Sequence, residues 1–350
     1  MKALVIQELG KAAVIDIDEP MTRPGYCKFK TVAVALNPTD WRHIDILGQK
    51  GSLVGCDYAG IVTEIGPGCE SDIQVGDKIW GTCHGANNSN PQDGAFAELI
   101  SQRDDICGKI PKNMSFEQAS TFGVGVISIG QVLYQSFGFP LLPEQVFNPV
   151  TLLVSGGSTA TGMLAIQFAK LSGITVLATA SPRNFDFVKS LGADQVFDYN
   201  TESCGEEIRA YTNNKLQYVF DAVSNESTFN LCAAALSSNS APALHFTGLL
   251  PTDTFPRKDV IVQNTLAYTA GGERFFKFGI TIPAIPADYE FAKVFLRLST
   301  ELIDSGKIKP PIEVGTGGLY GVIDGLQLLR EEKVSAKKLV YLVADTDNST

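Results

Sequence analysis

Residues 151–162 of the chain read TLLVSGGSTATG. The apolar run 151–154 is typical of a strand that is buried on both faces of a parallel sheet. A glycine-rich turn follows it, and residues 162–171 have the spacing of a helix. This order of strand, turn and helix predicts the first unit of a βαβ fold, whose glycines let the backbone approach a ligand closely.

The same alternation continues along the chain. We expect further strands at 175–179, 195–199, 218–223, 243–247 and 265–269, and helices at 184–191, 202–211 and 227–236. Six strands separated by helices predict an α/β fold with a doubly wound parallel sheet of the Rossmann type.

The two ends of the chain have a different pattern. Up to about residue 125, short apolar stretches such as 27–34, 60–66 and 77–81 alternate with glycine and proline, which predicts a β-barrel-like lobe. An amphipathic helix at 289–303 and a strand at 338–343 fit no further βα unit. We therefore expect a first lobe of residues 1–125 completed by 290–350, and a Rossmann domain of residues 126–289, with a cofactor between them.

Composition excludes several classes of partner. The net charge of -10 and the lack of a basic stripe argue against nucleic acid and anionic membranes, and no apolar run reaches the roughly 18 residues of a membrane span. The seven cysteines include no C-x2-C pair, so neither a disulfide framework nor a zinc finger is indicated. We expect a cytoplasmic protein that acts on a small molecule, free or carried by another protein.

The glycine turn predicts a dinucleotide site. Its spacing departs from G-x-G-x-x-G, and the hydroxyls of residues 158–161 could donate to phosphate oxygens instead. A fold that prefers NAD has Asp or Glu about 20 residues further on, at the end of the second strand. Residues 179–184 contain no carboxylate, whereas Ser181, Arg183 and Tyr199 could hold a 2′-phosphate, so NADPH is favoured. The alternative is that Arg183 is a solvated charge and Ser181 a helix N-cap.

Several segments together resemble a known superfamily. Residues 55–62, 75–81 and 94–98, with the glycine turn, resemble the medium-chain dehydrogenases/reductases, and the first three segments resemble their chaperonin-10-like (GroES-like) catalytic lobe. Residues 156–161, 180–186 and 196–199 resemble more specifically the stand-alone enoyl reductases that act in trans with fungal polyketide synthases. The resemblance implies NADPH-driven reduction of an α,β-unsaturated thioester of a polyketide that is bound to an acyl carrier protein, in secondary metabolism.

The resemblance also implies a set of site residues. Positions that match cofactor contacts in that family are Thr39, Asp40, Trp41, Arg42, Ser158, Thr159, Ala160, Thr161, Ser181, Pro182, Arg183, Asn184, Tyr199, Gly248, Leu249 and Ser335. Positions that match substrate contacts are Thr121, Phe122, Gly123, Val124, Gly125, Val126, Ile127, Ser128, Thr269, Ala270, Gly271, Gly272 and Glu273.

A metal site is not expected. Zinc enzymes of the superfamily bind the metal through a cysteine and a Gly-His-Glu motif, where this chain has residues 37–40, NPTD, and residues 55–57, GCD. Zinc needs about four suitably placed ligands. We interpret Cys56 as a small buried core residue.

Two residues are candidates for catalysis. Arg42 matches a basic position near the nicotinamide ribose and could orient cofactor or substrate, while Glu273 could act as an acid or base if burial raised its pKa. The proton donor of a reduction is not identifiable from the sequence. Glu273 also leaves open a redox-neutral isomerase that shifts a double bond of a polyketide.

Further alternatives remain open. One is a quinone-reductase-like enzyme that acts on free enones, and another is a non-catalytic partner of a synthase. A monomer is favoured, because prolines at 283 and 286 would obstruct pairing at the edge of the predicted sheet.

Overall fold

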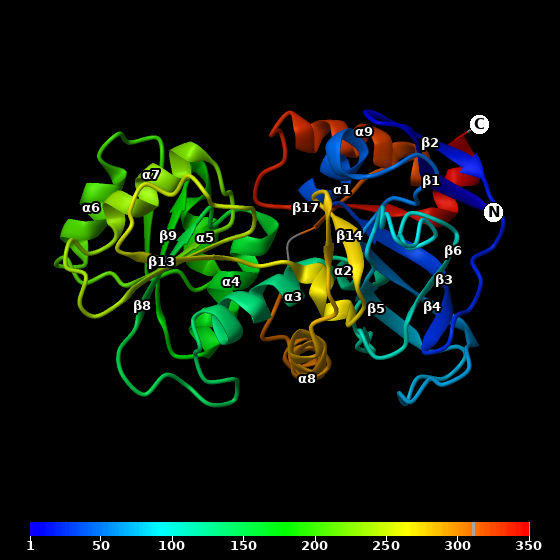
Figure 1. The fold of residues 1–350 in the computed structure, drawn as a ribbon, viewed down its shortest axis with the longest axis horizontal. Helices are drawn as coiled ribbons and strands as arrows, with labels where there is room; N and C mark the ends of the chain where they lie inside the picture. The colour runs from blue at the N-terminus through cyan, green and yellow to red at the C-terminus, as the bar shows by residue number, and fades with distance from the viewer. Residues whose placement is uncertain (310–311, 350) are drawn as a thin grey trace. The chain divides into compact units, whose positions relative to one another are not determined.

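The computed structural model of the chain describes residues 1–309 and 312–349 (Figure 1). Contacts within this part of the chain define two compact units. Unit 1 contains residues 1–127 and the described residues from 268 onwards, and unit 2 contains residues 128–267. The sequence prediction placed residues 268–289 with the Rossmann domain. In the structure they return to unit 1, because Tyr268 stacks on His84 at 4.1 Å between ring centroids. The predicted lobe end at residue 350 lies outside the described residues.

Unit 2 is built on a parallel sheet with the strand order β10-β9-β8-β11-β12-β13. In chain order this is 3-2-1-4-5-6, the doubly wound Rossmann order that the sequence predicts. The strands are β8 (Thr151–Ser155), β9 (Thr175–Ala180), β10 (Gln195–Asp198), β11 (Tyr218–Asp221), β12 (Leu244–Gly248) and β13 (Val260–Asn264).

Helices connect these strands. They are α4 (Ala160–Leu171), the short 3-10 helix η3 (Pro182–Asn184), α5 (Phe185–Ser190), α6 (Cys204–Tyr211) and α7 (Glu226–Ala235). Leu153, Val219 and Phe246 on neighbouring strands form a core with Cys232 of α7, and all four side chains are fully buried. The central strand is therefore covered on its apolar face, as its sequence predicts.

The prediction for the last strand of the sheet was wrong. The edge strand β13 covers residues 260–264, whereas the predicted strand at 265–269 runs into the 3-10 helix η4 (Ala267–Gly271). The prolines at 283 and 286 consequently follow a hairpin of unit 1 and not the edge of the Rossmann sheet. These prolines therefore give no reason to expect a monomer, and the monomeric state stays a prediction.

Unit 1 contains a second, mostly antiparallel sheet, in the order β16-β17-β3-β4-β5-β7, with β6 paired to β3. Its strands are β3 (Tyr26–Ala35), β4 (Asp57–Ile65), β5 (Lys78–Thr82), β6 (Leu99–Arg103), β7 (Cys107–Lys109), β16 (Ile312–Val314) and β17 (Lys338–Leu342). Two hairpins accompany it, β1 (Lys2–Glu8) with β2 (Lys11–Asp16) and β14 (Phe275–Lys277) with β15 (Ile280–Ile282). The C-terminal strand β17 lies antiparallel to β3, so the end of the chain completes this sheet.

The remaining helices belong to unit 1, except α3 (Gly123–Gly130), which crosses the boundary at residue 127, and the π-helix η2 (Gln131–Ser136), which lies in unit 2. Those of unit 1 are α1 (Pro38–Arg42), the π-helix η1 (His43–Leu47), α2 (Phe116–Ala119), α8 (Pro286–Asp304), α9 (Gly318–Arg330) and the 3-10 helix η5 (Val343–Ser349). None of the helices in the described ranges is long and apolar enough to cross a membrane.

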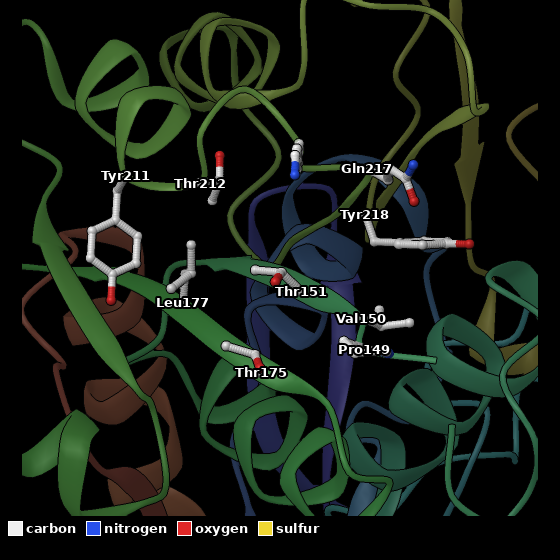
Figure 2. A pocket seen from close by; sticks show the side chains of 10 residues that line it. Pro149, Val150, Thr151, Thr175, Leu177, Tyr211, Thr212, Gln217 and Tyr218 are labelled. Carbon is white, nitrogen blue, oxygen red and sulfur yellow. The ribbon is translucent and has the colours of Figure 1, made fainter. Parts of the chain in front are cut away.

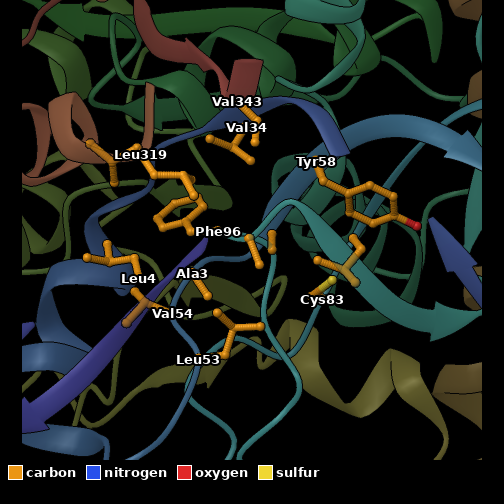
Figure 3. Packing of buried hydrophobic residues seen from close by; sticks show 14 of the residues in the cluster. Ala3, Leu4, Val34, Leu53, Val54, Tyr58, Cys83, Phe96, Leu319 and Val343 are labelled. Atoms are coloured by element: carbon orange, nitrogen blue, oxygen red, sulfur yellow. The ribbon is translucent and has the colours of Figure 1, made fainter. Parts of the chain in front are cut away.

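The core of unit 1 brings together distant parts of the sequence (Figure 3). One buried cluster contains Leu4 of β1, Val34 of β3, Leu319 of α9 and Phe96 from the loop before β6. All four residues are 0% exposed. Such a core depends on residues from both ends of the chain, since α9 lies more than 200 residues beyond β3.

Candidate functional site

The glycine turn between β8 and α4 is tight. Gly156 has a φ of +81°, a conformation that glycine adopts without strain. A Cβ on Gly156 would lie 2.7 Å from Cγ2 of Val223, and one on Gly162 would lie 2.2 Å from the carbonyl oxygen of Gly156. Both positions therefore need glycine, and close packing of strand, turn and helix at such glycines is typical of dinucleotide-binding turns.

The hydroxyls of this turn have different tasks. Oγ1 of Thr159 accepts a hydrogen bond from the Gly162 N–H at 3.0 Å and donates to the Gly156 carbonyl at 2.8 Å, so it caps α4. Ser158, Ala160 and Thr161 are half-buried at the start of the helix. The Thr159 hydroxyl is thus engaged within the turn, whereas Ser158 and Thr161 are the better candidates to donate to a phosphate.

The predicted 2′-phosphate residues lie at the carboxyl ends of two neighbouring strands. Parallel pairing sets Asp198, the last residue of β10, opposite Ala180, the last residue of β9. Ser181 and Tyr199 are the next residues, so the register brings their two segments side by side. Two parts of the sequence that are 18 positions apart therefore leave the sheet from neighbouring strands, and a shared role in binding a 2′-phosphate stays a prediction.

Arg183 is exposed, and none of the ion pairs found in the described part of the chain includes it. Ser181 precedes η3 as its N-cap residue but makes no capping hydrogen bond with its side chain, and its Oγ accepts from Nδ2 of Asn184 at 3.2 Å. The N-cap alternative for Ser181 is therefore right in position but not in hydrogen bonding. Pro182 begins η3, and the Tyr199 side chain is 50% exposed.

The other predicted cofactor residues of unit 2 lie at the same edge of the sheet. Gly248 ends β12, and the Leu249 N–H donates to Oγ of Ser224 at 3.0 Å. Asp221 ends β11, but its side chain is buried and accepts from the Val223 N–H at 3.0 Å and from the Thr228 hydroxyl at 2.5 Å. Burial raises the pKa of Asp221, and these hydrogen bonds hold it inside the unit rather than facing a ligand.

A cavity of about 270 Å³ lies at the opposite edge of this sheet (Figure 2). Thr151, Thr175 and Tyr218, the first residues of β8, β9 and β11, line it. Ligands of open α/β sheets bind at the carboxyl ends of the strands. This cavity is therefore distinct from the predicted cofactor site.

In unit 1 the predicted residues Thr39, Asp40, Trp41 and Arg42 belong to α1. Oδ2 of Asp40 accepts from the Asn37 N–H at 2.7 Å in a capping box. Asp40 is 1% exposed, and burial together with nearby Asp57 raises its pKa to about 7, against the lowering effect of the Asn37 hydrogen bond. The Arg42 guanidinium lies 5.3 Å from the centroid of the Trp41 ring, and partial burial lowers the pKa of Arg42.

A cluster of polar and aromatic side chains surrounds Tyr268. The Tyr268 hydroxyl lies 2.7 Å from Oγ1 of Thr39 and 3.8 Å from Sγ of Cys56. Its ring stacks on His84 at 4.1 Å, and the edge of His43 approaches it at 5.8 Å between centroids. We call these residues, together with Lys277, the Tyr268 cluster.

Lys277 is the unusual member of this cluster. Its side chain is 2% exposed, although it lies in the short strand β14 between the exposed Phe276 and Phe278. Its Nζ hydrogen-bonds to Nε2 of His43 and lies 4.4 Å from the Tyr268 ring centroid. Burial lowers the pKa of Lys277 to about 8, against the raising effect of Cys56.

The two histidines of the cluster are neutral. Burial and the charge of Lys277 lower the pKa of His43 to about 3, against the raising effect of the Thr39 carbonyl, and burial lowers that of His84 far below its usual value. Nδ1 of His43 lies 2.6 Å from the carbonyl oxygen of Thr39, an acceptor, so Nδ1 carries the proton and Nε2 accepts from Lys277.

A buried ion pair lies beside the cluster. Lys338 of β17 pairs with Asp57, which is 0% exposed, and also donates to Oδ1 of Asn37 at 3.0 Å and the Thr121 carbonyl at 3.1 Å. Oδ1 of Asp57 accepts from the Val124 N–H at 2.6 Å. Asp57 therefore links β4, β17 and the start of α3. It occupies the position that matches the Glu of the Gly-His-Glu motif.

The predicted substrate residues 121–128 are largely enclosed by protein. Thr121, Phe122, Val126 and Ile127 are at most 1% exposed, and Val124 is half-buried. The remaining members, Gly123, Gly125 and Ser128, are buried. Of this segment, Val124 is the side chain best placed to meet a substrate without rearrangement.

The second predicted substrate segment, 269–273, begins next to Tyr268. Thr269 and Ala270 are buried, while Gly271, Gly272 and Glu273 are half-buried. The Glu273 side chain is 42% exposed, accepts from the Tyr26 hydroxyl at 2.8 Å and lies 3.8 Å from the Arg103 guanidinium. The burial on which its candidate role as an acid or base depended is therefore incomplete, because Tyr26 and Arg103 hold the carboxylate in a partly solvated pair.

The remaining expectations concern metal ligands and Ser335. In the described ranges, no group of three or more His, Cys, Asp and Glu side chains is arranged to hold a metal ion. Cys56 is 0% exposed, which confirms its interpretation as a buried residue. Ser335 is half-buried in the loop before β17.

The sequence interpretation missed Tyr268 and Lys277. Tyr268 fell inside a predicted strand, where an aromatic residue is ordinary. Lys277 had a weak signal: in the run Phe275 to Phe278 the period of two puts Lys277 on the same face as the buried Phe275. A lysine on the buried face of a strand is rare enough to be noticed.

Comparisons with known proteins define the class first. Residues 23–112 match the alcohol dehydrogenase GroES-like domain, and residues 160–278 match the zinc-binding dehydrogenase family. A solved structure described as a putative zinc-dependent alcohol dehydrogenase from Rhizobium etli superposes with a TM-score of 0.80 at 22% identity, over 98% of each chain. The chain therefore has the fold of an oxidoreductase of the medium-chain dehydrogenase/reductase superfamily, whose members use a nicotinamide cofactor, which confirms the expected fold class.

Closer relatives define the family. The trans-enoyl reductase ACTTS2 of Alternaria alternata is 42% identical over 98% of both chains. The trans-enoyl reductase resD of Aspergillus sclerotiorum is 43% identical over 98% of this chain and 100% of its own length. The chain belongs to the trans-enoyl reductase family.

Proposed function

We propose that this chain uses NADPH to reduce the α,β-double bond of an unsaturated thioester, a polyketide intermediate presented by the acyl carrier protein of a synthase in secondary metabolism. The observation that carries the choice of NADPH is the edge of unit 2 where β9 and β10 end. There Asp198 pairs with Ala180, the residues directly before Tyr199 and Ser181, and residues 181–184, which include Arg183, contain no carboxylate.

The glycine turn supports a dinucleotide at the same edge. At Gly156, Gly157 and Gly162 a Cβ would clash with neighbouring atoms of the protein, so only glycine allows this tight strand–turn–helix packing, and the N-terminus of α4 offers backbone N–H groups for phosphate. A bound nicotinamide nucleotide supplies the hydride. The protein supplies charge for the 2′-phosphate through Arg183, and Ser158 and Thr161 supply donors for the pyrophosphate.

Unit 1 supplies the groups that act on the substrate. Arg42 and Thr39 lie on α1, and Tyr268 leads into the segment 269–273. Addition of hydride to the β-carbon places negative charge on the thioester oxygen, which hydrogen-bond donors stabilise. Arg42, whose guanidinium has no carboxylate partner in the described ranges, is our candidate to orient the cofactor or substrate.

We also propose that the reaction needs no zinc. The residues at the ligand positions of zinc relatives are engaged elsewhere: Asp57 holds Lys338, and Asp40 caps α1. Catalytic zinc takes three protein ligands and keeps a fourth position for water or substrate. Metal analysis of purified protein tests this proposal, because activity that follows the zinc content would contradict it.

The decisive experiment compares two nucleotides and two variants. NADPH should bind more tightly than NADH in calorimetry. Arg183→Ala should weaken NADPH binding on the order of 10-fold to 100-fold and leave NADH binding unchanged, since one charge-assisted contact is worth about 1.5–3 kcal/mol. Lys189→Ala is the matched control, because it removes an exposed cation of α5, the helix that follows Arg183. Equal effects of Arg183→Ala on both nucleotides would contradict the assignment.

Turnover then identifies the reaction. Incubation with synthetic unsaturated thioesters should consume NADPH at 340 nm and increase the product mass by two hydrogens. An unchanged mass with a shifted spectrum would instead indicate the isomerase. That alternative has lost its structural argument, because Glu273 is partly solvated and paired with Tyr26 and Arg103. The cytoplasmic location and the monomeric state remain predictions.

A further inference from the structure

Lys277 presents a problem that the proposed function does not explain. It is 2% exposed, and the ion pairs found among residues 1–309 and 312–349 give it no carboxylate partner. A buried cation without a counter-ion costs free energy, and proteins keep such groups mainly where they have a task. Its contacts are His43 and the face of the Tyr268 ring.

The contacts continue from Lys277 in an unbroken chain. Nζ of Lys277 bonds to Nε2 of His43, and Nδ1 of His43 lies 3.3 Å from Oγ1 of Thr39. Oγ1 of Thr39 lies 2.7 Å from the Tyr268 hydroxyl. An imidazole that accepts a proton at one nitrogen can release one at the other, and hydroxyls both accept and donate. The chain can therefore carry a proton from the ammonium group to the phenol.

Tyr268 is the last residue of this chain of contacts and lies next to residues predicted to bind substrate and cofactor. It is half-buried, directly precedes the predicted substrate segment 269–273 and bonds to Thr39, a predicted cofactor contact. Burial, with the charges of Cys56 and Asp40, raises the pKa of Tyr268 well above 10, so the phenol remains protonated at neutral pH. A thioester enolate is a stronger base than a phenolate and can take this proton.

We propose that Tyr268 donates the proton that completes the reduction and that Lys277, through His43 and Thr39, restores it. This inference rests on the proposed reductase function and supplies the donor that the sequence does not reveal. Once hydride addition has formed the enolate, its electron pair takes the proton from the Tyr268 oxygen to form the C–H bond at the α-carbon. The O–H bond breaks and leaves a phenolate next to the Lys277 cation, which attracts it. The relay returns a proton to the phenolate, and water restores the ammonium group.

The roles of the two residues differ. In the proposed step Tyr268 gives its proton directly to the reacting carbon and is a catalytic residue, whereas Lys277 acts only through the relay and is a positioning residue. The titratable groups that face Lys277 are His43 of η1, Tyr268 of η4, Cys56 before β4 and His84 after β5, with Asp40 of α1 behind Cys56. Because both histidines are neutral near pH 7, Lys277 is the member of the Tyr268 cluster that titrates near pH 8 and controls the relay.

The first test removes only the phenol. In deuterated water, the wild-type enzyme should deliver deuterium to one face of the α-carbon. Tyr268→Phe should lower the turnover rate on the order of 100-fold, the lower range for a general acid, and yield both epimers, because water then protonates from either face. Tyr58→Phe removes another buried hydroxyl of unit 1, one without a hydrogen-bond partner in the described ranges, and should behave as wild type.

The second test addresses Lys277 through pH. The wild-type turnover rate should fall as pH rises through about 8, because deprotonated Lys277 cannot restore the phenol. In Lys277→Met, most of the turnover rate should be lost, and the remaining rate should no longer decrease near pH 8. In Lys277→Arg, the turnover rate should be retained and should decrease only at a higher pH. A merely structural role would leave the position of the fall unchanged in every active variant.

A third measurement needs no turnover. In protein labelled with ¹³C at the lysine ε-carbons, one NMR signal, absent from Lys277→Met, should titrate near pH 8. Titration of Lys277 with the other lysines, or single-face protonation by Tyr268→Phe at the wild-type rate, would overturn the inference while leaving the reductase intact. Failure of wild-type protein to consume NADPH with any unsaturated thioester would instead overturn the reductase function, and the inference with it.

Discussion

The carboxyl edge of unit 2 and the Tyr268 cluster of unit 1 are built in opposite ways. At the edge of unit 2, the candidate residues lie at or shortly after the ends of strands, and the parallel register pairs Ala180 with Asp198, the residues directly before Ser181 and Tyr199. The Tyr268 cluster instead gathers side chains from α1, η1, η4, β14 and two loops. A site set by local order in the chain is visible in a sequence, whereas one set by tertiary packing is not.

The largest effect that we expect from this difference concerns the stability of unit 1. Lys338→Met should lower the free energy of unfolding of unit 1 by about 3–5 kcal/mol, because it leaves the Asp57 carboxylate buried without a cation. Urea unfolding followed by tryptophan fluorescence measures this, since both tryptophans, Trp41 and Trp80, lie in unit 1. Lys337→Ala breaks the neighbouring exposed pair with Glu313 and should cost less than about 1 kcal/mol. Equal losses in both variants would show that the buried pair does not support unit 1.

A second, pH-dependent effect should come from Asp40. Its folded pKa of about 7 lies above the ordinary 3.8, so the unfolded chain releases this proton first as pH rises. Asp40 should therefore contribute stability below about pH 4 that is lost progressively up to about pH 7. Asp40→Asn keeps the acceptor for the Asn37 N–H and should remove this loss, which amounts to about 4 kcal/mol at pH 7. The test is the difference between wild type and variant in urea unfolding at pH 4 and pH 7.5, and a difference that does not change with pH would refute the burial of a titrating carboxyl.

The smallest effect on stability should come from the glycine turn. Gly156→Ala combines a φ of +81° with a Cβ 2.7 Å from Val223, and should cost about 1–2 kcal/mol in unit 2. The same change should weaken NADPH binding at least tenfold, since the turn cannot keep its shape. Gly10→Ala imposes a similar φ, +83°, with open space around the new methyl group, and it serves as the control. If calorimetry finds the same NADPH affinity for both variants, the glycine turn does not take part in nucleotide binding.

The sequence predicted much of unit 2 because its signals are local. The apolar run of β8, the glycines after it and the missing carboxylate after β9 each occupy a few consecutive residues. The error at β13 has a physical cause: residues 265–269 have the composition of a strand, but the Tyr268 ring packs on His84 in unit 1 and the chain turns there. Tertiary contacts overruled local preference at the point where the chain leaves the sheet.

The sequence predicted less of unit 1 for the same reason. Thr39 was anticipated through a family resemblance, and Cys56 was correctly interpreted as buried. Lys277 was missed because a lysine in a short strand is usually solvated, and its burial depends on His43, which is 234 positions away. Glu273 was a candidate acid or base only if buried, and its partners Tyr26 and Arg103 could not be anticipated from its neighbours in the chain.

The insertion of unit 2 within unit 1 has a consequence for biosynthesis. Residues 128–267 leave the ribosome as one continuous segment and can fold while the rest is still being made. Strand β3 must wait some 300 residues for β17, and until Lys338 arrives the Asp57 carboxylate has no cation. A nascent chain stopped shortly before residue 338 should therefore hold a folded unit 2 and an incomplete unit 1, a species that cellular proteases can recognise.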